Sequence, residues 1–446
     1  MDLQRRGFLG VQVRAIPQVS KNSQSIGVEV VSVFDDSTAS LLGVVPGDVL
    51  AMINGVPIRT PGDVGTLLAS VKAGTKVVLE IVRKGEKKVL SNEMVPLPKE
   101  KFDEADVIHG SVKTAAGIQR SILTVPKNKI GPPVVYILQG FDCSSIEKPL
   151  VRADAYTRLI TMLTRSGFAT FRLEKSNVGD SVGMPCREIG FDIETKGFVD
   201  GLRHLVASPR IDGKNIYLLG ISLGGIWAPI LAEDVPVKGI ISFGTIAKTW
   251  EEYLYENSRR QSLLAGRTYS SIERNLKLSS IFWHELFASG RTPKEILDAK
   301  TELRALAPDL TIDIAGGDYN HLFGRHYSFV KELNAVNIAE KWENVRSSTL
   351  LLYGVGDYIA SESDQKLIES ILLRKGTGVT LKYVNSDHYW RRSTSYVESY
   401  RNLRENRSPA FQEDILNEIQ KWLEGQQTQS RSKGSHNVTI LSSAKV

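Results

Sequence analysis

The sequence predicts an α/β fold: a mainly parallel sheet with helices on both faces and a helical insertion, preceded by a small β-rich domain. The first observation is length, because 446 residues exceed what one hydrophobic core usually organises. The second is a repeated order of apolar strand and amphipathic helix from about residue 106 to residue 424, which is typical of parallel sheets. The third is a different pattern before residue 95, where short alternating segments are separated by turn-rich stretches.

Composition favours a soluble globular protein, with 41% hydrophobic and 24% charged residues. The net charge is +6, but the basic residues are scattered and form no stripe interleaved with aromatic residues. We therefore expect no nucleic-acid partner. No apolar run approaches the ~20 residues that a membrane span requires, so we also expect no such span.

The expected location is cytoplasmic. The N-terminal residues contain no apolar segment of the kind found in secretory signals and no small-residue cleavage site. Two cysteines in 446 residues also fit a reducing compartment. Cys143 and Cys186 each follow a predicted strand and should lie at the same edge of the sheet. A disulfide between them is the alternative to two free thiols, which the expected compartment favours.

Residues 1–95 are predicted to form a unit of their own. The segment Pro46-Gly47-Asp48 places a tight turn before a strand, and Asn54-Gly55 favours a two-residue hairpin turn. A helix is expected to begin at Thr60-Pro61, because proline lacks the N–H that the first helical residue leaves unused.

This unit resembles a PDZ domain of the bacterial protease-associated type. The matching segments are Gly7–Val11, Val45–Gly55 and Val82–Gly85. The ligand of such a domain would add as a strand beside Val11–Arg14. The resemblance also implies a loop whose backbone N–H groups bind the C-terminal carboxylate of a protein or peptide, formed by Gly7, Phe8, Leu9 and Gly10. The alternative is a domain that serves only as a packing brace.

A polar linker at 96–105 leads to the second domain at 106–424, in which a mostly helical insertion occupies about 247–345. Aromatic residues of this insertion suggest an apolar pocket for an acyl group or side chain, although aromatic residues in helices are more often core. They are Trp250, Tyr253, Tyr255, Phe282, Trp283, Phe287, Tyr319 and Phe323. Residues 425–446 are rich in Gln, Ser and Lys and are expected to form a flexible tail.

The most informative segment is Gly220-Ile221-Ser222-Leu223-Gly224. It follows a short apolar strand and precedes a helix, so the serine should lie on a sharp turn with its hydroxyl exposed at the helix N-terminus. Glycines two before and two after are needed because side chains there would collide across the turn. This pattern indicates a nucleophilic serine.

A serine nucleophile needs a base and an acid that orients the base. Among the histidines after Ser222, His388 is favoured because its loop follows the last sheet strand. Asp357 lies just past the preceding strand and is the expected acid, whereas Glu362 and Asp364 are better explained as charges in the first turn of a helix. The backbone N–H groups of Leu223 and Phe141 are expected to form the oxyanion hole, and no cofactor or metal is expected.

Residues 106–424 thereby resemble an α/β-hydrolase with a cap insertion, of the serine-peptidase and acyl-hydrolase branch. The resemblance rests on Ser222, Asp357 and His388 in that order. One departure is Gln139-Gly140 in the oxyanion loop, where many members have His-Gly.

Three functions are consistent with these residues. The favoured one is a serine hydrolase of an ester or thioester, in which the PDZ-like domain recruits a substrate or partner. The second is a peptidase or amidase that captures peptide C-termini with that domain. The third is a non-catalytic scaffold, which is less favoured because all three residues of the expected triad are present.

Overall fold

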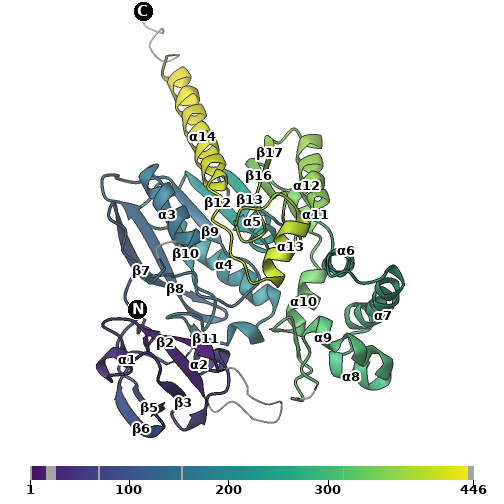
Figure 1. The fold of residues 1–446 in the computed structure, drawn as a ribbon. Helices are drawn as coiled ribbons and strands as arrows, with labels where there is room; N and C mark the ends of the chain where they lie inside the picture. Colours follow the sequence, from purple (N-terminus) through teal and green to yellow (C-terminus); the bar gives the residue numbers. More distant parts are fainter. Residues whose placement is uncertain (1–2, 17–26, 69–70, 152–153, 315, 440–446) are drawn as a thin grey trace, which may run out of the picture.

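The computed structural model describes residues 3–16, 27–68, 71–151, 154–314 and 316–439. It contains a small β-rich domain at the N-terminus and a larger domain built on a mixed sheet with helices on both faces (Figure 1). The predicted fold class is therefore confirmed.

The N-terminal domain is an antiparallel sheet in the order β1-β2-β3-β5-β6, with β4 paired to β3. One face of this sheet encloses a core of aliphatic side chains. Strand β1 lies at the edge of the sheet, and helix α2 packs beside it. The elements are β1 (Val11–Ala15), β2 (Val28–Val33), α1 (Thr38–Leu41), β3 (Val49–Ile53), β4 (Val56–Pro57), α2 (Pro61–Leu68), β5 (Lys76–Arg83) and β6 (Glu86–Glu93).

The large sheet has the order β11-β8-β10-β9-β12-β13-β16-β17, with β7 paired to β8. Pairing is parallel from β10 to β17, and β7, β8 and β11 add an antiparallel section at one side. The strands are β7 (Ala105–Thr114), β8 (Gly117–Pro126), β9 (Val134–Leu138), β10 (Ala169–Leu173), β11 (Val182–Gly183), β12 (Ile216–Ile221), β13 (Gly239–Phe243), β16 (Ser348–Gly354) and β17 (Val379–Val384).

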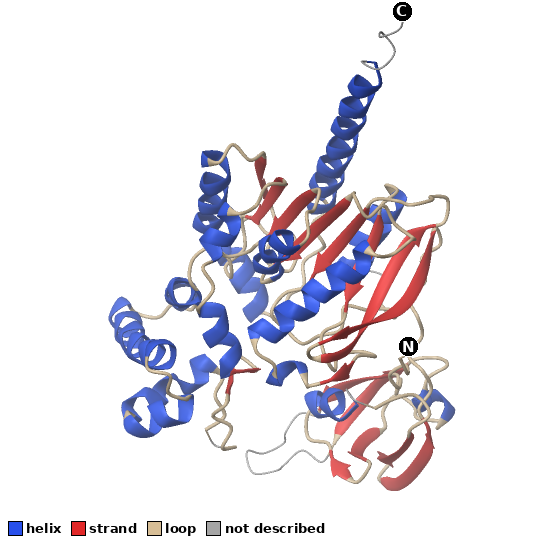
Figure 2. Cartoon of the chain, turned by 180° about the vertical axis from the view of Figure 1, so that it is seen from behind, coloured by secondary structure: helices blue, strands red, loops and turns tan. Residues whose placement is uncertain are grey.

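Helices cover both faces of this sheet (Figures 1 and 2). Helices α3 and α14 contribute to one core layer, and α4, α5 and α12 contribute to the other. The central strands β9, β12 and β13 are buried on both sides, which explains their continuous apolar sequence. The helices are α3 (Ala155–Arg165), η1 (Cys186–Glu188), α4 (Phe191–Val206), α5 (Gly224–Asp234), α12 (Glu362–Arg374), α13 (Tyr396–Arg404) and α14 (Asp414–Thr439).

The predicted insertion lies between β13 and β16 and is mostly helical. It projects to the side of the large sheet, away from the N-terminal domain (Figure 1). Its elements are α6 (Trp250–Leu264), α7 (Tyr269–Ala288), α8 (Pro293–Ala299), η2 (Thr301–Leu306), α9 (Ala307–Leu310), β14 (His321–Leu322), β15 (Arg325–His326), α10 (Tyr327–Asn334) and α11 (Ile338–Glu343). We call it the cap.

Residues 425–439, which are expected from the sequence to belong to a flexible tail, are helical in the structure. Helix α14 continues without interruption to Thr439, and residues 440–446 lie outside the described part of the chain. The segment contains Gln, Lys and Arg, which favour helices, and no proline that would end one. Within the described residues, no helix combines the length and the apolar character that crossing a bilayer requires.

Arg5 joins the two domains. Its guanidinium donates to Glu147 and Asp180 of the large domain, each at 2.7 Å, and both carboxylates are buried. Arg120 of β8 also donates to Asp180, at 3.1 Å, and Lys72 of the small domain donates to the Gly179 carbonyl at 3.3 Å. Buried ion pairs therefore contribute to this interface.

Candidate active site

Ser222 occupies the turn between β12 and α5, as predicted. Its φ is +56°, a left-handed value that a non-glycine residue adopts at a cost. Its N–H donates to the Phe243 carbonyl at 2.8 Å, which fixes the turn against β13. A Cβ at Gly220 would overlap the Gly224 carbonyl, and one at Gly224 would overlap the Leu138 carbonyl. The glycines are therefore required by close approach, and the strained turn presents Ser222 at the end of the sheet.

His388 and Asp357 form a hydrogen-bonded pair. His388 Nδ1 lies 2.7 Å from Asp357 Oδ2, and the Asp357 side chain is fully buried. The other oxygen, Oδ1, accepts the N–H groups of Ile359 and Ala360 at 2.9 and 2.8 Å. Two backbone dipoles of its own loop thus orient the carboxylate towards the imidazole.

The protonation of His388 reflects two opposed effects. Burial lowers the pKa of His388, but the charge of Asp357 and the hydrogen bond to it raise the pKa more, so it lies above the usual value. The described residues hold no hydrogen bond between the Ser222 hydroxyl and the His388 ring, although both side chains line the same cavity. Such contacts often tighten only when substrate is bound.

The other candidate acids lie elsewhere. Glu362 pairs with Lys366 at 2.7 Å in the first turn of α12. Asp364, in the same turn, is buried and accepts the N–H groups of Ala247 and Lys248 at 2.9 and 3.2 Å. Neither carboxylate bonds His388.

The other histidines are also engaged away from the serine. His284 is exposed on α7. His321 contacts Glu188 at 2.9 Å, and His326 contacts the Ser328 hydroxyl at 2.8 Å. The structure therefore brings His388 to Asp357 and places these three outside the cavity that contains Ser222.

The predicted oxyanion donors line that cavity together with Ser222. Within the described residues, neither the Phe141 N–H nor the Leu223 N–H has an acceptor. A Cβ on Gly140 would lie 3.3 Å from the Ser222 Cβ and 3.7 Å from its hydroxyl oxygen. The loop therefore approaches the nucleophile so closely that a side chain at this position would be in tight contact with Ser222, while the φ of Gly140 is not positive.

The cavity has a volume of about 830 Å³. Three of the eight aromatic residues singled out in the cap line it: Trp250, Tyr253 and Phe323. Phe282 and Trp283 are instead buried in the core of the cap. The expected aromatic pocket is thus present, although most of those rings are core.

The Phe141 side chain belongs to the aromatic part of the cavity. Its ring stacks on Trp250, with centroids 6.1 Å apart and planes at 6°, and packs edge-on against Phe329 at 5.4 Å. Asp142 and Arg391 contribute charged groups to the lining. An apolar group attached to the reacting carbonyl would find aromatic surface next to Ser222.

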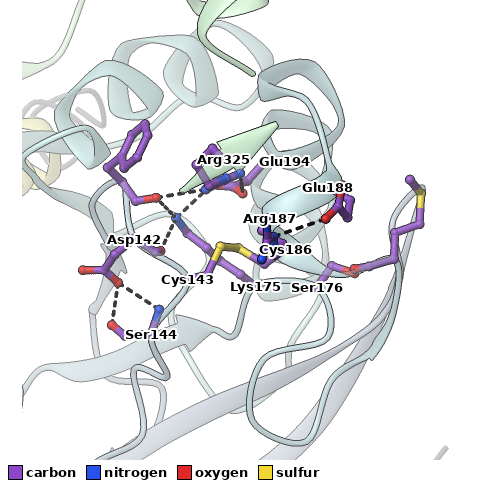
Figure 3. Close-up of a disulfide and its surroundings, with 12 residues drawn as sticks. Asp142, Cys143, Ser144, Lys175, Ser176, Cys186, Arg187, Glu188, Glu194 and Arg325 are labelled. Carbon is purple, nitrogen blue, oxygen red and sulfur yellow. Dashed lines mark hydrogen bonds and ion pairs between the residues drawn. A yellow bond between two sulfur atoms is a disulfide. The ribbon is translucent and has the colours of Figure 1, made fainter. Parts of the chain in front are cut away.

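The preference for two free thiols was wrong. Cys143 and Cys186 form a disulfide with a Cα–Cα distance of 5.9 Å, across 43 residues of sequence (Figure 3). The two loops do lie together at the same edge of the sheet, as expected from the strands that precede them. The preference failed because it rested on the expected compartment and not on this proximity.

Sequence analysis missed a buried charged group beneath the oxyanion loop. Lys175 follows β10, Glu194 lies in the first turn of α4, and Arg325 comes from β15 of the cap (Figure 3). Glu194 lies 2.9 Å from the Lys175 ammonium and 2.6 Å from the Arg325 guanidinium. All three side chains are at most 2% exposed. The only sequence signal was a charged pair, Glu174-Lys175, directly after a buried strand.

The peptide-binding loop of the small domain differs from expectation in part. The N–H groups of Gly7 and Phe8 already donate to backbone carbonyls within the domain, at 2.7 and 2.8 Å. The N–H groups of Leu9 and Gly10 have no acceptor within the described residues. Because β1 is an edge strand, its outer side pairs with no other strand in the part of the domain that the structure describes. Two of the four predicted donors therefore stay candidates for a carboxylate.

Comparison with known families agrees with this architecture. Residues 7–93 match the family model described as PDZ domain. These residues form a PDZ domain. A probable periplasmic serine endoprotease DegP-like from Pseudomonas fulva is 37% identical over 107 residues, which cover 22% of this chain and 22% of that protein. One from Pseudomonas fluorescens is 33% identical over 137 residues, 29% of this chain and 26% of that protein. The chain thus spans about a quarter of the length of these relatives.

Solved structures similar to the chain include Est1E from Butyrivibrio proteoclasticus, with 12% identity and a TM-score of 0.44 over 72% of this chain and 99% of that one. The Pyrococcus furiosus esterase PF2001 has 13% identity and a TM-score of 0.43, and the match covers 73% of this chain and 96% of that one. A Pyrococcus horikoshii acylaminoacyl peptidase has 12% identity and a TM-score of 0.43, and the match covers 85% of this chain and 52% of that one. The assignment of an α/β-hydrolase fold rests on the sheet order and the serine turn themselves.

Proposed function

We propose that the protein is a serine hydrolase that cleaves an ester or thioester through an acyl-enzyme. The observation that carries this proposal is the hydrogen-bonded His388–Asp357 pair, whose histidine lines the same cavity as a serine held at φ +56°. The unpartnered N–H groups of Phe141 and Leu223 in the same cavity support it.

The proposed reaction has two halves. The Ser222 hydroxyl oxygen attacks the carbonyl carbon while His388 Nε2 takes its proton, and the Phe141 and Leu223 N–H groups bind the oxyanion. The bond to the leaving alcohol or thiol breaks, His388 returns the proton to that group, and the acyl group stays on Ser222. Water then attacks the acyl carbon while His388 takes one of its protons. The bond between that carbon and the Ser222 oxygen breaks, His388 returns the proton to Ser222, and a carboxylic acid is released.

Covalent labelling tests this reaction class. A fluorophosphonate should label the wild-type protein and should not label Ser222→Ala, which should also lose about 10⁴-fold or more in ester turnover. Labelling that persists in Ser222→Ala would exclude Ser222 as the nucleophile. Absence of labelling in the wild-type protein would favour the non-catalytic scaffold.

A peptidase or amidase is the second candidate. The observation that favours it is the docking of a PDZ domain on the large domain through the buried pairs of Arg5 with Glu147 and Asp180. A peptide whose C-terminus is bound beside β1 would then be held at a fixed position relative to Ser222. Turnover of 4-nitrophenyl esters, acyl thioesters and peptide amides by the same preparation would rank the two reactions.

The PDZ domain is proposed to recruit a substrate or partner through a free C-terminus. A peptide with a hydrophobic C-terminal residue should bind the full chain, and the same peptide with a C-terminal amide should bind much more weakly. Equal affinity for both would contradict carboxylate recognition by the Leu9 and Gly10 N–H groups.

The cytoplasmic location also stays a prediction. The Cys143–Cys186 bond removes one of its two arguments, because structural disulfides persist mainly in oxidising compartments. Trapping free thiols with a maleimide in intact cells would test it: two labelled cysteines are expected in the cytoplasm, and none in an oxidising compartment.

A further inference from the structure

The carbonyls of the oxyanion loop all face one buried cation. The Lys175 ammonium donates to the carbonyls of Gly140 at 2.7 Å, Phe141 at 3.3 Å and Asp142 at 2.9 Å. Three bonds require three N–H donors, which a protonated lysine has and a neutral amine lacks. Arg325 donates to the Phe141 carbonyl as well, at 2.9 Å. The loop is therefore held from beneath by two charged side chains.

This contact fixes the direction of one peptide group. The Gly140 carbonyl and the Phe141 N–H belong to the same planar trans peptide, so they point in opposite directions. The Gly140 carbonyl points to Lys175, which is fully buried and does not line the cavity. The Phe141 N–H has no acceptor among the described residues and must point away from Lys175. Phe141 and Ser222 line the same cavity.

Two carboxylates act on the cations beneath the loop. Glu194 is the carboxylate within ion-pair distance of both Lys175 and Arg325, and the described residues provide no second carboxylate at that distance from either cation. Asp142, in the oxyanion loop itself, acts on Lys175 from farther away, and the Lys175 charge helps to lower the pKa of Asp142. Burial lowers the pKa of Lys175, and the Glu194 charge opposes this, so the contact with Glu194 supports the protonated form.

We propose that Lys175 is a positioning residue for the oxyanion hole. It holds the Gly140–Phe141 peptide with the N–H towards the reacting carbonyl, and its charge polarises that peptide so that the N–H becomes a stronger donor. Hydrogen bonds in a chain reinforce one another in this way when the local dielectric constant is low. Negative charge that develops on the substrate oxygen is then stabilised by Lys175 through one intervening peptide.

Arg325 extends this role to the cap. It comes from β15 and packs 3.9 Å from the Phe329 ring of α10, so its position depends on the cap. Because it holds the Phe141 carbonyl, the cap and the oxyanion loop should move together. The inference rests on the proposed function, because an oxyanion forms only if Ser222 attacks a carbonyl.

The test compares Lys175→Met with a matched control, Arg120→Met. Lys175→Met leaves Glu194 paired with Arg325, so no buried charge loses its only partner. Arg120 is equally buried, donates to backbone carbonyls and shares Asp180 with Arg5, but it does not touch the oxyanion loop.

Lys175→Met should lower kcat for a 4-nitrophenyl ester about 10- to 100-fold with little change in KM, which is less than the loss of a direct oxyanion donor. The affinity for a trifluoromethyl ketone, which forms an oxyanion with Ser222, should weaken by the same factor as kcat/KM. Affinity for the product acid should not change. Arg120→Met should keep the wild-type kcat and inhibitor affinity.

Two outcomes would overturn the inference. One is a wild-type kcat in Lys175→Met, and the other is a lower kcat without weaker binding of the ketone. If Lys175→Met does not fold, Arg325→Met carries the same test, because it leaves Lys175 paired with Glu194. A wild-type protein that does not react with a fluorophosphonate would instead refute the proposed function, which separates the two failures.

Discussion

The two ends of the candidate active site are held in place by different means. In the acid–base half, Asp357 is oriented by the N–H groups of Ile359 and Ala360, two and three residues along its own loop. In the oxyanion half, the loop that carries Phe141 is held by Lys175 and Arg325. Lys175 lies 35 residues from Gly140 in the sequence, and Arg325 lies 184 residues from Phe141. One half is organised locally and the other by the tertiary fold.

The two halves also differ in charge. Asp357 is buried, and within the described residues its ion-pair partner is His388 alone, so the acid–base half contains an uncompensated carboxylate whenever His388 is neutral. The oxyanion half contains two buried cations, Lys175 and Arg325, directly beneath the loop. In the proposed acyl transfer, a positive imidazolium would form at the first end and a negative oxyanion at the second, and each would meet a charge of opposite sign already in place.

Asp357→Asn breaks the acid–base half and should have the largest effect, a loss of about 10⁴-fold in kcat. The pKa of His388 should fall, because burial lowers it and the charge that raises it is removed. Since the base acts when neutral, the acid limb of the pH profile of kcat/KM should move to lower pH. An unchanged limb would show that His388 is not the titrating base.

Removing the disulfide tests the long-range organisation of the oxyanion half. The double substitution Cys143→Ser with Cys186→Ser opens a loop of 43 residues, which should lower the free energy of unfolding by roughly 4 kcal/mol. Thermal unfolding with and without a reductant measures this. The reductant should lower the Tm of the wild-type protein and leave the Tm of the double variant unchanged. If the reductant changes the Tm of both proteins equally, the disulfide does not form.

Glu147 connects the oxyanion half of the site with the PDZ domain. Its segment follows the loop that carries Phe141, and its carboxylate pairs with Arg5 of the PDZ domain. Burial raises the pKa of Glu147, but the bonds from His109 and Arg5 outweigh this and lower it to about 2. A carboxyl group whose pKa is lowered by folding stabilises the folded state at pH values above its usual pKa. For Glu147 this contribution is about 3 kcal/mol, and it is lost as the pH falls from about 4.5 towards 2. Chemical unfolding across that range should show the loss in the wild-type protein and not in Glu147→Gln.

Gly244→Ala offers the smallest and most local change in the acid–base half. Its Cβ would lie 2.8 Å from Asp357 Oδ2 and 3.2 Å from His388 Nδ1, at a φ of +58°. Gly266→Ala is the matched control, because its φ is +72° and its Cβ would meet nothing within 4 Å. Both variants should lose about 1–2 kcal/mol of stability from backbone strain, and only Gly244→Ala should lose about tenfold in kcat as well. Equal kcat in the two would mean that the pair tolerates displacement.

The same contrast explains what sequence could predict. Ser222, Asp357 and His388 each follow a strand within a short segment, so their order and spacing were sufficient to choose them. Lys175 and Arg325 act through contacts between segments far apart in sequence, and nothing in the residues beside Arg325 marks its role. The two strands around it have two residues each, too short for a recognisable pattern.

Other differences have physical reasons of the same kind. The end of α14 was missed because Gln-, Ser- and Lys-rich composition was given more weight than the absence of proline in that segment. At the PDZ loop, the motif predicted the position of four N–H groups but not that two would bond within the domain. Local motifs predicted where groups lie, and the fold decided which of them are free.

Phe141 contributes a backbone N–H group and an aromatic ring to the site, and a mutation can change the ring without changing the N–H group. Its N–H is part of the backbone and persists with almost any residue at this position, whereas its ring, stacked on Trp250, is replaceable. Under the proposed function, a change of side chain at 141 would alter the surface beside the acyl portion of a substrate while keeping the backbone donor. Single substitutions at this position could then change the substrate preference and leave the proposed oxyanion hole in place.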